Sequence, residues 1–270
     1  MPEPRFESVR RRFAQLHESA NFILPNPWDV GSARLLETLG FTALATTSSG
    51  FAASLGRMDM ATSRTELVDH VASLTAAVAL PINVDAERCF SADPAGVEET
   101  INLLAEAGAS GISIEDFDPE RGGMDPVDVA AERVAVAAVA CRRHGITLTG
   151  RAENHIRGVD DLDDTIARLL AYREAGANVL YAPGLSDIDH IARVVSVTGT
   201  PINVLALANG PSVPELAAVG VRRVSTGGSL AWAAYGALVN AAQELQTAGT
   251  STYLGQAVSG KLRSTAFAPR

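Results

Sequence analysis

Residues 81–87 read PINVDAE, a short and mainly apolar run that ends in two carboxylates, Asp85 and Glu87. A run that is apolar on both faces is typical of a parallel strand covered by helices. A helical stripe follows this run, and Gly108 ends it at the position where helices commonly terminate in a left-handed residue. Residues 81–108 therefore predict one strand–helix unit of a parallel sheet.

The same unit repeats along the chain. Strand-like runs start about 20 to 40 residues apart, which is the length that a strand and a crossover helix need. The eight runs are 22–28, 43–49, 81–87, 111–117, 147–153, 178–184, 201–206 and 223–228. Eight units predict an α/β fold, a (β/α)8 barrel of the TIM type, with a doubly wound sheet of eight strands as the alternative.

No linker rich in Pro, Gly or Ser divides the 270 residues, so we expect a single barrel domain over 1–270. Within it we expect an N-terminal helix at about 6–19, the barrel at about 20–247 and a C-terminal tail at 248–270.

Composition excludes several classes of function. The chain has 22 basic and 31 acidic residues, a net charge of −9, so it lacks the basic field of a nucleic-acid-binding protein. Its two cysteines are too few for a disulfide framework and fit a reducing cytoplasm. The uncharged stretches are interrupted by Gly, Ser, Thr or Asn, so we expect no membrane span. The sequence favours a cytoplasmic protein that binds a small molecule.

Polar side chains gather where the predicted strands end, which is where a barrel keeps its active site. Asp85 and Glu87 lie two residues apart on a strand and so face the same side. Two carboxylates this close repel each other unless a cation lies between them, and oxygen ligands favour Mg²⁺ or Mn²⁺. Glu115, on the next run, could be a third ligand or could orient a metal-bound water. The alternative is a solvated strand end, paired with Arg88 or Arg151.

Arg151 ends the fifth run. Beside a metal it would hold a substrate carboxylate by paired hydrogen bonds, and the alternative is a structural salt bridge to Glu115 or Glu153. Residues 47–50, TSSG, could turn hydroxyl and N–H groups toward an anion. Residues 225–229, STGGS, suit a phosphate site and suit a tightly packed helix N-terminus equally well, so a phosphate-sugar barrel enzyme stays open.

Together these strand ends resemble the isocitrate lyase/phosphoenolpyruvate mutase superfamily, and most of all its bacterial phosphonomutase-like branch. The resemblance runs in order from about residue 10 to 245. It is carried by NPWD at 26–29, SAR at 32–34, TSSG at 47–50, LG at 55–56 with Asp59, VDAE at 84–87, IED at 114–116, GRAEN at 150–154 and EAGA at 174–177.

The resemblance implies Mg²⁺, a 2-oxo acid or its enolate, and a barrel whose eighth helix is exchanged between subunits. It implies metal ligands at Asp85 and Glu87. It implies catalytic roles for Arg151 on the substrate carboxylate, for Glu115 beside the metal ligands and for Asp59 on a metal-bound water. From these strand ends we expect substrate contacts at Trp28, Asp29, Thr47, Ser48, Ser49, Gly50, Glu153 and Asn203.

The segment after the fourth run departs from the family. The lyases carry Lys-Lys/Arg-Cys-Gly-His on a mobile lid there, whereas residues 118–124 read DPERGGM, without the proton-donating Cys. The Lys- and Asn-bearing lid of the mutase is missing as well. Glu87, Arg88 and Cys89 stand where Asp, Thr and Gly are usual. The usual routes of isocitrate cleavage and of phosphonopyruvate formation are therefore not expected.

The sequence thus predicts a Mg²⁺-dependent lyase, hydrolase or decarboxylase that cleaves a C–C bond of a small 2-oxo or 2-hydroxy acid through an enolate. Phosphonomutase-type P–C chemistry and a non-catalytic barrel that binds a 2-oxo acid are the alternatives. A homodimer or homotetramer is expected, because the helix predicted at 229–246 has an apolar face that needs a partner. That face consists of Leu230, Trp232, Ala233, Leu238 and Val239.

Overall fold

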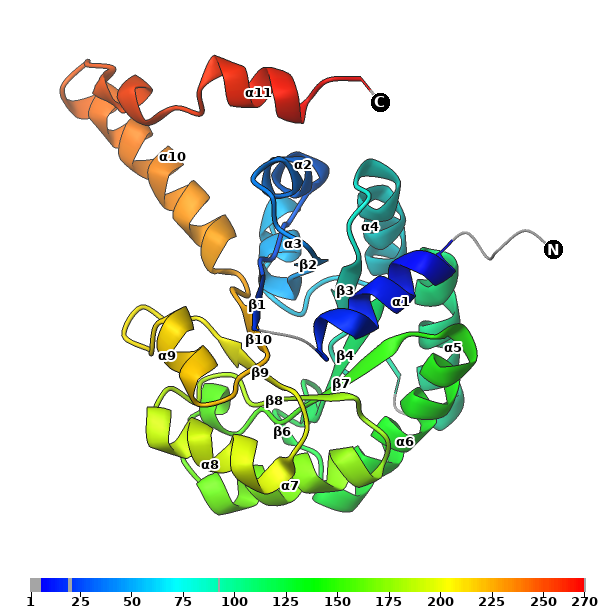
Figure 1. Ribbon diagram of the computed structural model, residues 1–270. Coiled ribbons are helices and arrows are strands. Elements are labelled where there is room, and N and C mark those ends of the chain that lie inside the picture. Colours follow the sequence, from blue (N-terminus) through cyan, green and yellow to red (C-terminus); the bar gives the residue numbers. More distant parts are fainter. Residues whose placement is uncertain (1–5, 19–20, 92, 270) are drawn as a thin grey trace.

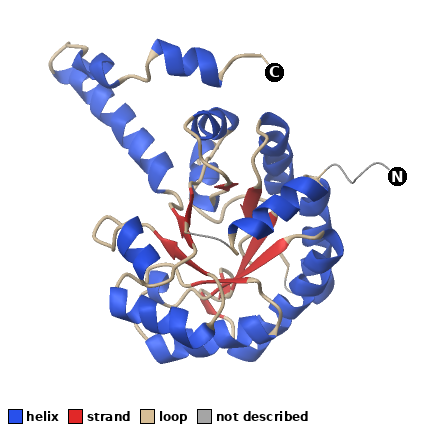
Figure 2. Ribbon diagram, viewed as in Figure 1, coloured by secondary structure: helices blue, strands red, loops and turns tan. Residues whose placement is uncertain are grey.

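The computed structural model describes residues 6–18, 21–91 and 93–269, in which eight parallel strands curve into a nearly closed barrel ringed by helices (Figures 1 and 2). In spatial order the strands are β1 (Phe22–Leu24), β10 (Arg223–Ser225), β9 (Ile202–Leu205), β8 (Val179–Tyr181), β7 (Thr147–Arg151), β4 (Gly111–Glu115), β3 (Ile82–Asp85) and β2 (Leu44–Ala45). Where β2 meets β1, the N–H of Ala45 donates to the C=O of Pro25 at 3.0 Å. The predicted barrel is confirmed, and each strand starts within a residue or two of its predicted run.

The outer layer consists of helices that connect the strands. They are α2 (Val30–Thr38), α3 (Ser48–Ser54), α4 (Arg64–Ala77), α5 (Pro94–Glu106), α6 (Val127–His144), α7 (Leu162–Glu174), α8 (Ile188–Thr198) and α9 (Val213–Ala218). Gly145 ends α6 with a φ of 66°, the left-handed conformation predicted for the glycines that precede strands.

Successive strand residues face opposite sides of the barrel wall. The outward residues are apolar and join the core between the strands and the helices; examples are Val84, Ile112, Ile114, Leu148 and Val224. The inward residues of the same strands are largely polar, and Asn83, Ser113 and Arg223 line a cavity in the lumen. The hydrophobic core is therefore a shell around the barrel, and the lumen is left for polar chemistry.

Helix α1 (Glu7–Leu16) covers the amino ends of the strands. Its Phe13 packs against Gly111, the first residue of β4, where a Cβ would lie 2.4 Å from the ring. Its Arg10 donates from Nε to the C=O of Ala109 at 2.9 Å. Helix α1 lies within the range 6–19 expected from the sequence, of which residue 19 lies outside the described residues.

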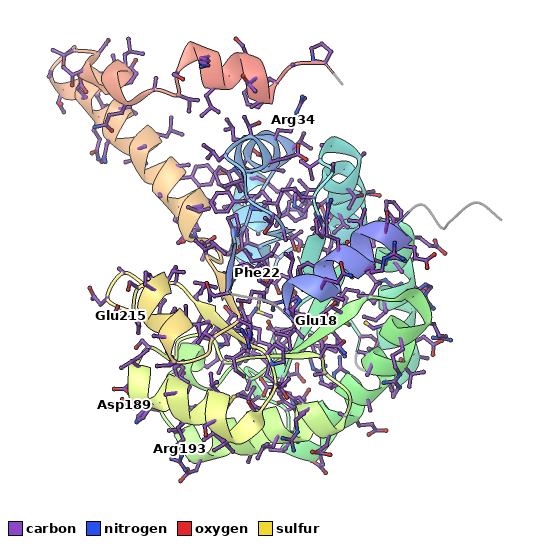
Figure 3. All side chains as sticks on the ribbon, in the orientation of Figure 1. Glu18, Phe22, Arg34, Asp189, Arg193 and Glu215 are labelled. Atoms are coloured by element: carbon purple, nitrogen blue, oxygen red, sulfur yellow. The ribbon has the colours of Figure 1, made fainter. Side chains whose placement is uncertain are left out.

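The C-terminal part leaves the barrel. Helix α10 (Ser229–Thr247) projects away from it (Figure 1), and Ala231 is the one buried residue in this fully described helix. The tail then forms a 3₁₀ turn, η2 (Thr252–Gln256), and helix α11 (Gly260–Ala266). Ser259 caps α11, and the guanidinium of Arg34 on α2 donates to the C=O of Ala268. Figure 3 shows Arg34 between α2 and α11. The expected tail is therefore partly helical, because a capped helix of two turns is too short to show in a periodicity.

Two short strands, β5 (Phe117–Asp118) and β6 (Gly123–Met124), form an antiparallel hairpin after β4. This hairpin contains the segment that departs from the family. No helix within the described ranges is long and apolar enough to cross a membrane.

Candidate active site

A cavity of about 310 Å³ lies at the carboxyl ends of the strands and reaches into the lumen. Its wall combines residues from most of the strands with the loops that follow them. Seven of the predicted site residues line it: Thr47, Ser48, Ser49, Asp59, Asp85, Arg151 and Asn203.

Arg151 is the centre of charge in this site. Its Nη1 lies 3.4 Å from Oδ1 of Asp85 and 3.2 Å from Oε2 of Glu115, and its Nε pairs with Oε1 of Glu153. Burial alone would lower the pKa of Arg151, but Glu115, Glu153 and Asp85 outweigh burial and raise this pKa well above its usual value. The guanidinium is therefore charged and held in one orientation.

The carboxylates outnumber this cation. Burial raises the pKa of Glu115 well above its usual value, although Arg151 opposes the shift. Burial, and after it the charges of Asp85 and Asp59, raise the pKa of Glu87 to about 8. A bound divalent cation would offset this excess of negative charge, so the electrostatics of the site suit one.

The donor set also suits Mg²⁺. Within the described ranges, no three His, Cys, Asp or Glu side chains are arranged to hold a metal together. Mg²⁺ commonly takes only one or two protein carboxylates and keeps waters and substrate oxygens as its other ligands. Asp85 in the cavity wall, with Asp59 in the same wall and Glu87 close enough for its pKa to respond to both charges, meets that requirement.

The loop that carries Glu87 has an unusual backbone. Glu87, Cys89 and Phe90 have φ values of 48°, 59° and 54°, a left-handed region that non-glycine residues rarely occupy. Cys89 is completely buried, and burial raises the pKa of its thiol to about 12, so it packs as a small apolar residue. The usual Gly at this position is thus replaced by a residue that fills space at a conformational cost.

The TSSG segment starts α3. Thr47 caps this helix by accepting a hydrogen bond from the N–H of Gly50 at 3.3 Å, and the N–H of Ser48 donates to Oδ2 of Asp85 at 3.4 Å. Nε1 of Trp232 on α10 donates to Oγ of Ser49 at 3.0 Å, so α10 contributes to the cavity wall.

Four predicted substrate contacts lie elsewhere than on the lumen. A Cβ on Gly50 would lie 3.0 Å from Cβ of Trp28, which shows that these two residues pack together. Asp29 caps α2 by accepting from the N–H of Ser32 at 2.6 Å. Glu153 is completely buried and pairs with Nε of Arg151. These placements indicate roles in positioning the strand ends, and their contact with substrate remains a prediction.

Several lining residues were not singled out from the sequence. Asn83, Ser113, Tyr181 and Arg223 all face the cavity. The alternation along the strands could have identified them, since Asn83 lies two residues before Asp85, and Arg223 two before Ser225, on the same strands.

The STGGS segment is already bonded within the chain. The N–H groups of Thr226 and Gly227 donate to Oδ1 of Asn26 at 2.9 and 3.0 Å. Since these backbone donors are engaged, the segment favours a packed helix start over a phosphate site.

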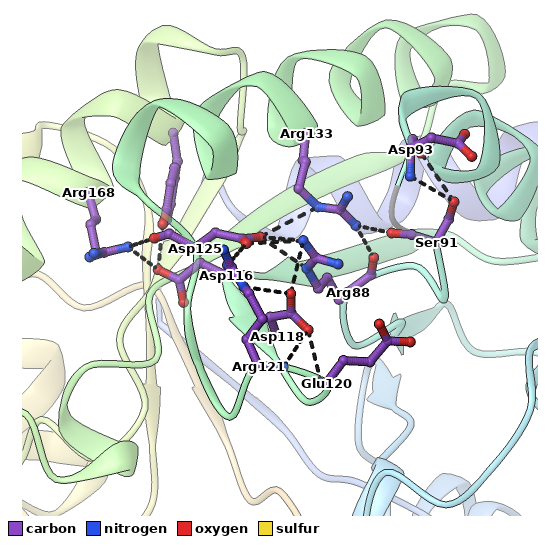
Figure 4. Close-up of polar contacts among 11 residues, drawn as sticks. Arg88, Ser91, Asp93, Asp116, Asp118, Glu120, Arg121, Asp125, Arg133 and Arg168 are labelled. Atoms are coloured by element: carbon purple, nitrogen blue, oxygen red, sulfur yellow. Dashed lines mark hydrogen bonds and ion pairs between the residues drawn. The ribbon is translucent and has the colours of Figure 1, made fainter.

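Ion pairs hold the two residues that flank the hairpin after β4, Asp116 and Asp125 (Figure 4). Arg88 donates from Nε and Nη2 to the two carboxylate oxygens of Asp125, both at 3.0 Å, and Asp125 is 1 % exposed. Arg168 donates from Nη1 to Asp116 at 3.1 Å and to the C=O of Asp125 at 2.8 Å. The segment that forms a mobile lid in the family is therefore tied to the loop after β3 and to α7.

The barrel and the charged cavity at its strand ends define an enzyme of the isocitrate lyase/phosphoenolpyruvate mutase superfamily. The chain belongs to the phosphoenolpyruvate phosphomutase family, whose model matches residues 13–246. The resemblance predicted from the sequence is thereby confirmed.

Individual relatives agree with this assignment. An uncharacterised protein of Mycobacterium tuberculosis is 33% identical over 212 residues, which cover 78% of this chain and 79% of that one. Oxaloacetate decarboxylase of Rhodopseudomonas palustris is 31% identical over 193 residues, 68% of this chain and 65% of that one. A crystal structure from Burkholderia cenocepacia, provisionally described as a lyase/mutase, has a TM-score of 0.93 and 48% identity over 97% of this chain and 96% of that one.

Proposed function

We propose that this chain is a Mg²⁺-dependent enzyme that cleaves a C–C bond of a small 2-oxo or 2-hydroxy acid through an enolate. The observation that carries the proposal is the arrangement of Asp85 and Arg151, which lie 3.4 Å apart in the wall of one cavity. A carboxylate for a cation and a guanidinium for a substrate carboxylate are thus side by side. A relative named oxaloacetate decarboxylase supports the same class of substrate.

The chain's own residues would bind and orient the substrate. Arg151 would pair with the substrate carboxylate, and Glu115 and Glu153 would keep its guanidinium in register. Asp85, supported by Glu87 and Asp59, would hold Mg²⁺, which when bound stabilises negative charge on the 2-oxo oxygen. Ser48 and Ser49 present polar groups to the same space.

A substrate panel tests this proposal, and the missing lid Cys predicts its outcome. A general acid contributes about 10²–10⁴-fold, so isocitrate and methylisocitrate should turn over slower than in an ordinary lyase by roughly that factor. Oxaloacetate should be the better substrate, because water can protonate its enolate product. Steady-state rates with Mg²⁺ on these three acids and on phosphonopyruvate give the measurement. Isocitrate cleavage at tens per second, an ordinary enzyme rate, would contradict this reading of the hairpin.

The alternatives produce different results in the same panel. Turnover of phosphonopyruvate alone would indicate P–C chemistry. Mg²⁺-dependent binding of a 2-oxo acid with no product would indicate a binding barrel.

The exposed apolar surface of helix α10 indicates that the chain forms a homo-oligomer. Trp232, Leu238 and Val239 are 55%, 64% and 52% exposed, an apolar surface that a second copy would cover. We expect a dimer or tetramer at micromolar concentration by light scattering, and a shift to smaller species for Leu238→Glu. Gln243→Glu, an exposed change on the same helix, is the matched control. A native protein that is monomeric at micromolar concentration would overturn the helix exchange.

A further inference from the structure

Arg223 is a buried cation inside the barrel. Its side chain points into the lumen from β10, the residue is 1 % exposed, and it lines the same cavity as Asp85 and Arg151. In the sheet, β8 and β9 separate its strand from β7, which carries Arg151. The two arginines therefore serve different parts of one cavity.

The hydrogen-bond partners of Arg223 within the described chain are all uncharged. Its Nε donates to Oδ1 of Asn203 at 2.9 Å, its Nη2 donates to Oγ1 of Thr149 at 3.0 Å, and its Nη1 lies 3.3 Å from Nε2 of His17. The carboxylates at the strand ends pair instead with Arg151.

His17 is held in its neutral form. Its Nδ1 lies 3.0 Å from the C=O of Phe13, and because a carbonyl only accepts, Nδ1 carries the proton. Its Nε2 then accepts from Arg223, which only donates. Burial, and after it the charge of Arg223, lower the pKa of His17 to about 3. The imidazole ring of His17 is therefore neutral and does not compensate the charge of Arg223.

The positive charge of Arg223 is thus not compensated within its surroundings. Burial lowers the pKa of Arg223 to about 9, which still leaves it protonated at neutral pH. A buried charge without a counter-ion is costly, and a guanidinium cannot escape this cost by losing its proton. A guanidinium has five N–H donors, so three contacts leave two for a ligand.

A second polar group beside the same space lacks a partner. The amide oxygen of Asn83 is buried without a hydrogen bond to any described residue, Asn83 is 4 % exposed, and it too lines the cavity. Asn83 also lies two residues before Asp85 on β3, so its side chain is one layer deeper in the lumen than the carboxylate of Asp85. The cavity therefore has an acidic rim and a floor whose charge is positive.

We infer that Arg223 forms an anion-binding subsite at the cavity floor, which takes a second carboxylate of the substrate. This inference rests on the proposed function, because the first carboxylate is the one assigned to Asp85-bound Mg²⁺ and Arg151. The substrate class narrows accordingly to short 2-oxo or 2-hydroxy dicarboxylic acids. Arg223 binds the far carboxylate, and Asn83 accepts from a hydroxyl or a water that accompanies it.

Matched pairs of ligands test the subsite by calorimetry in the presence of Mg²⁺. Malate is compared with 2-hydroxybutyrate, and 2-oxoglutarate with 2-oxopentanoate; within each pair a carboxylate is replaced by a methyl group. We expect the diacid to bind at least about tenfold tighter in one pair, the typical effect of a charge-assisted hydrogen bond. Oxalate probes the Asp85–Arg151 end alone.

Two variants test which residues cause the preference for the diacid over its methyl analogue. Arg223→Gln should remove the preference for the diacid and leave oxalate affinity unchanged. Asn83→Asp places a negative charge at the floor while keeping the arginine, and should also weaken the diacid selectively; it serves if Arg223→Gln does not fold. The exposed neighbour Arg222 provides the control Arg222→Gln, which should bind like the native protein.

The outcomes separate the two proposals. Oxalate binding with no diacid preference, or with a preference that both variants retain, would overturn the subsite and leave the proposed function intact. An absence of Mg²⁺-dependent oxalate binding would overturn the proposed function, and the subsite would then be decided by the diacid comparison alone.

Discussion

We expect the Asp85→Ala variant to lose Mg²⁺ binding and turnover while keeping its fold. Removing the carboxylate removes the one predicted ligand that lines the cavity. Arg151 would not be left unpaired, because Glu115 and Glu153 still contact it. The pKa of Glu87 should fall from about 8, since the charge of Asp85 contributes to raising it. Loss of one repulsive neighbour offsets loss of the ion pair, so the free energy of unfolding should change little.

Calorimetric titration of Mg²⁺ and steady-state turnover measure this expectation. Loss of groups that merely support a metal ligand already costs about 10–100-fold, so we expect turnover to fall by more than about 100-fold. Asp163→Ala is the matched control, because Asp163 is 80% exposed and pairs with Arg193 on the surface. Mg²⁺ affinity that is equal in the native protein and in Asp85→Ala would refute the metal site.

The Asp125→Ala variant should be strongly destabilised. Asp125 is 1 % exposed, accepts both hydrogen bonds of the Arg88 fork, and also pairs with Arg121 on the hairpin. Without it, Arg88 and the nearby Arg133, whose Nε lies 3.9 Å from Asp125, lose a shared counter-charge. Breaking a buried ion pair by removing one partner costs about 3–5 kcal/mol.

Urea unfolding gives the free energy, and melting should shift by roughly 6–20 °C for a chain of this size. Glu120→Ala changes an exposed carboxylate on the same hairpin and should stay within about 0.5 kcal/mol of the native protein. A loss below about 1 kcal/mol for Asp125→Ala would show that the network contributes no more than a surface ion pair. Turnover should also fall, because Arg88 follows Glu87 and the released loop would carry that carboxylate with it.

Local patterns were sufficient to predict the barrel. The apolar residues of the run at 81–87 and of its seven counterparts reflect packing of the outward strand face against the helices, and consecutive residues are enough to show this pattern. The same holds for the strand-end positions of Asp85 and Arg151, because parallel strands of a barrel end on one rim. The family resemblance added Asp59, which lies outside the strands and which the structure places on the cavity wall.

Interactions between distant segments could not be predicted in this way. The pair of Arg88 with Asp125 spans 37 residues, and that of Arg223 with His17 spans 206. No periodicity records such contacts, because they depend on how loops and α1 pack after the barrel has formed. For the same reason the sequence left Arg151 between a substrate role and a salt bridge, whereas the structure shows three carboxylates holding it in place.

The division of each strand between an apolar outer face and a polar inner face has a consequence for how such a protein changes over time. Stability depends mostly on outward residues such as Ile112 and Val224, whereas ligand preference depends on inward ones such as Ser113 and Arg223. Neighbouring codons thus fall under different selection. Drift at the inward positions can alter which acid is accepted while the packed shell stays the same, and this gives one scaffold access to many related reactions.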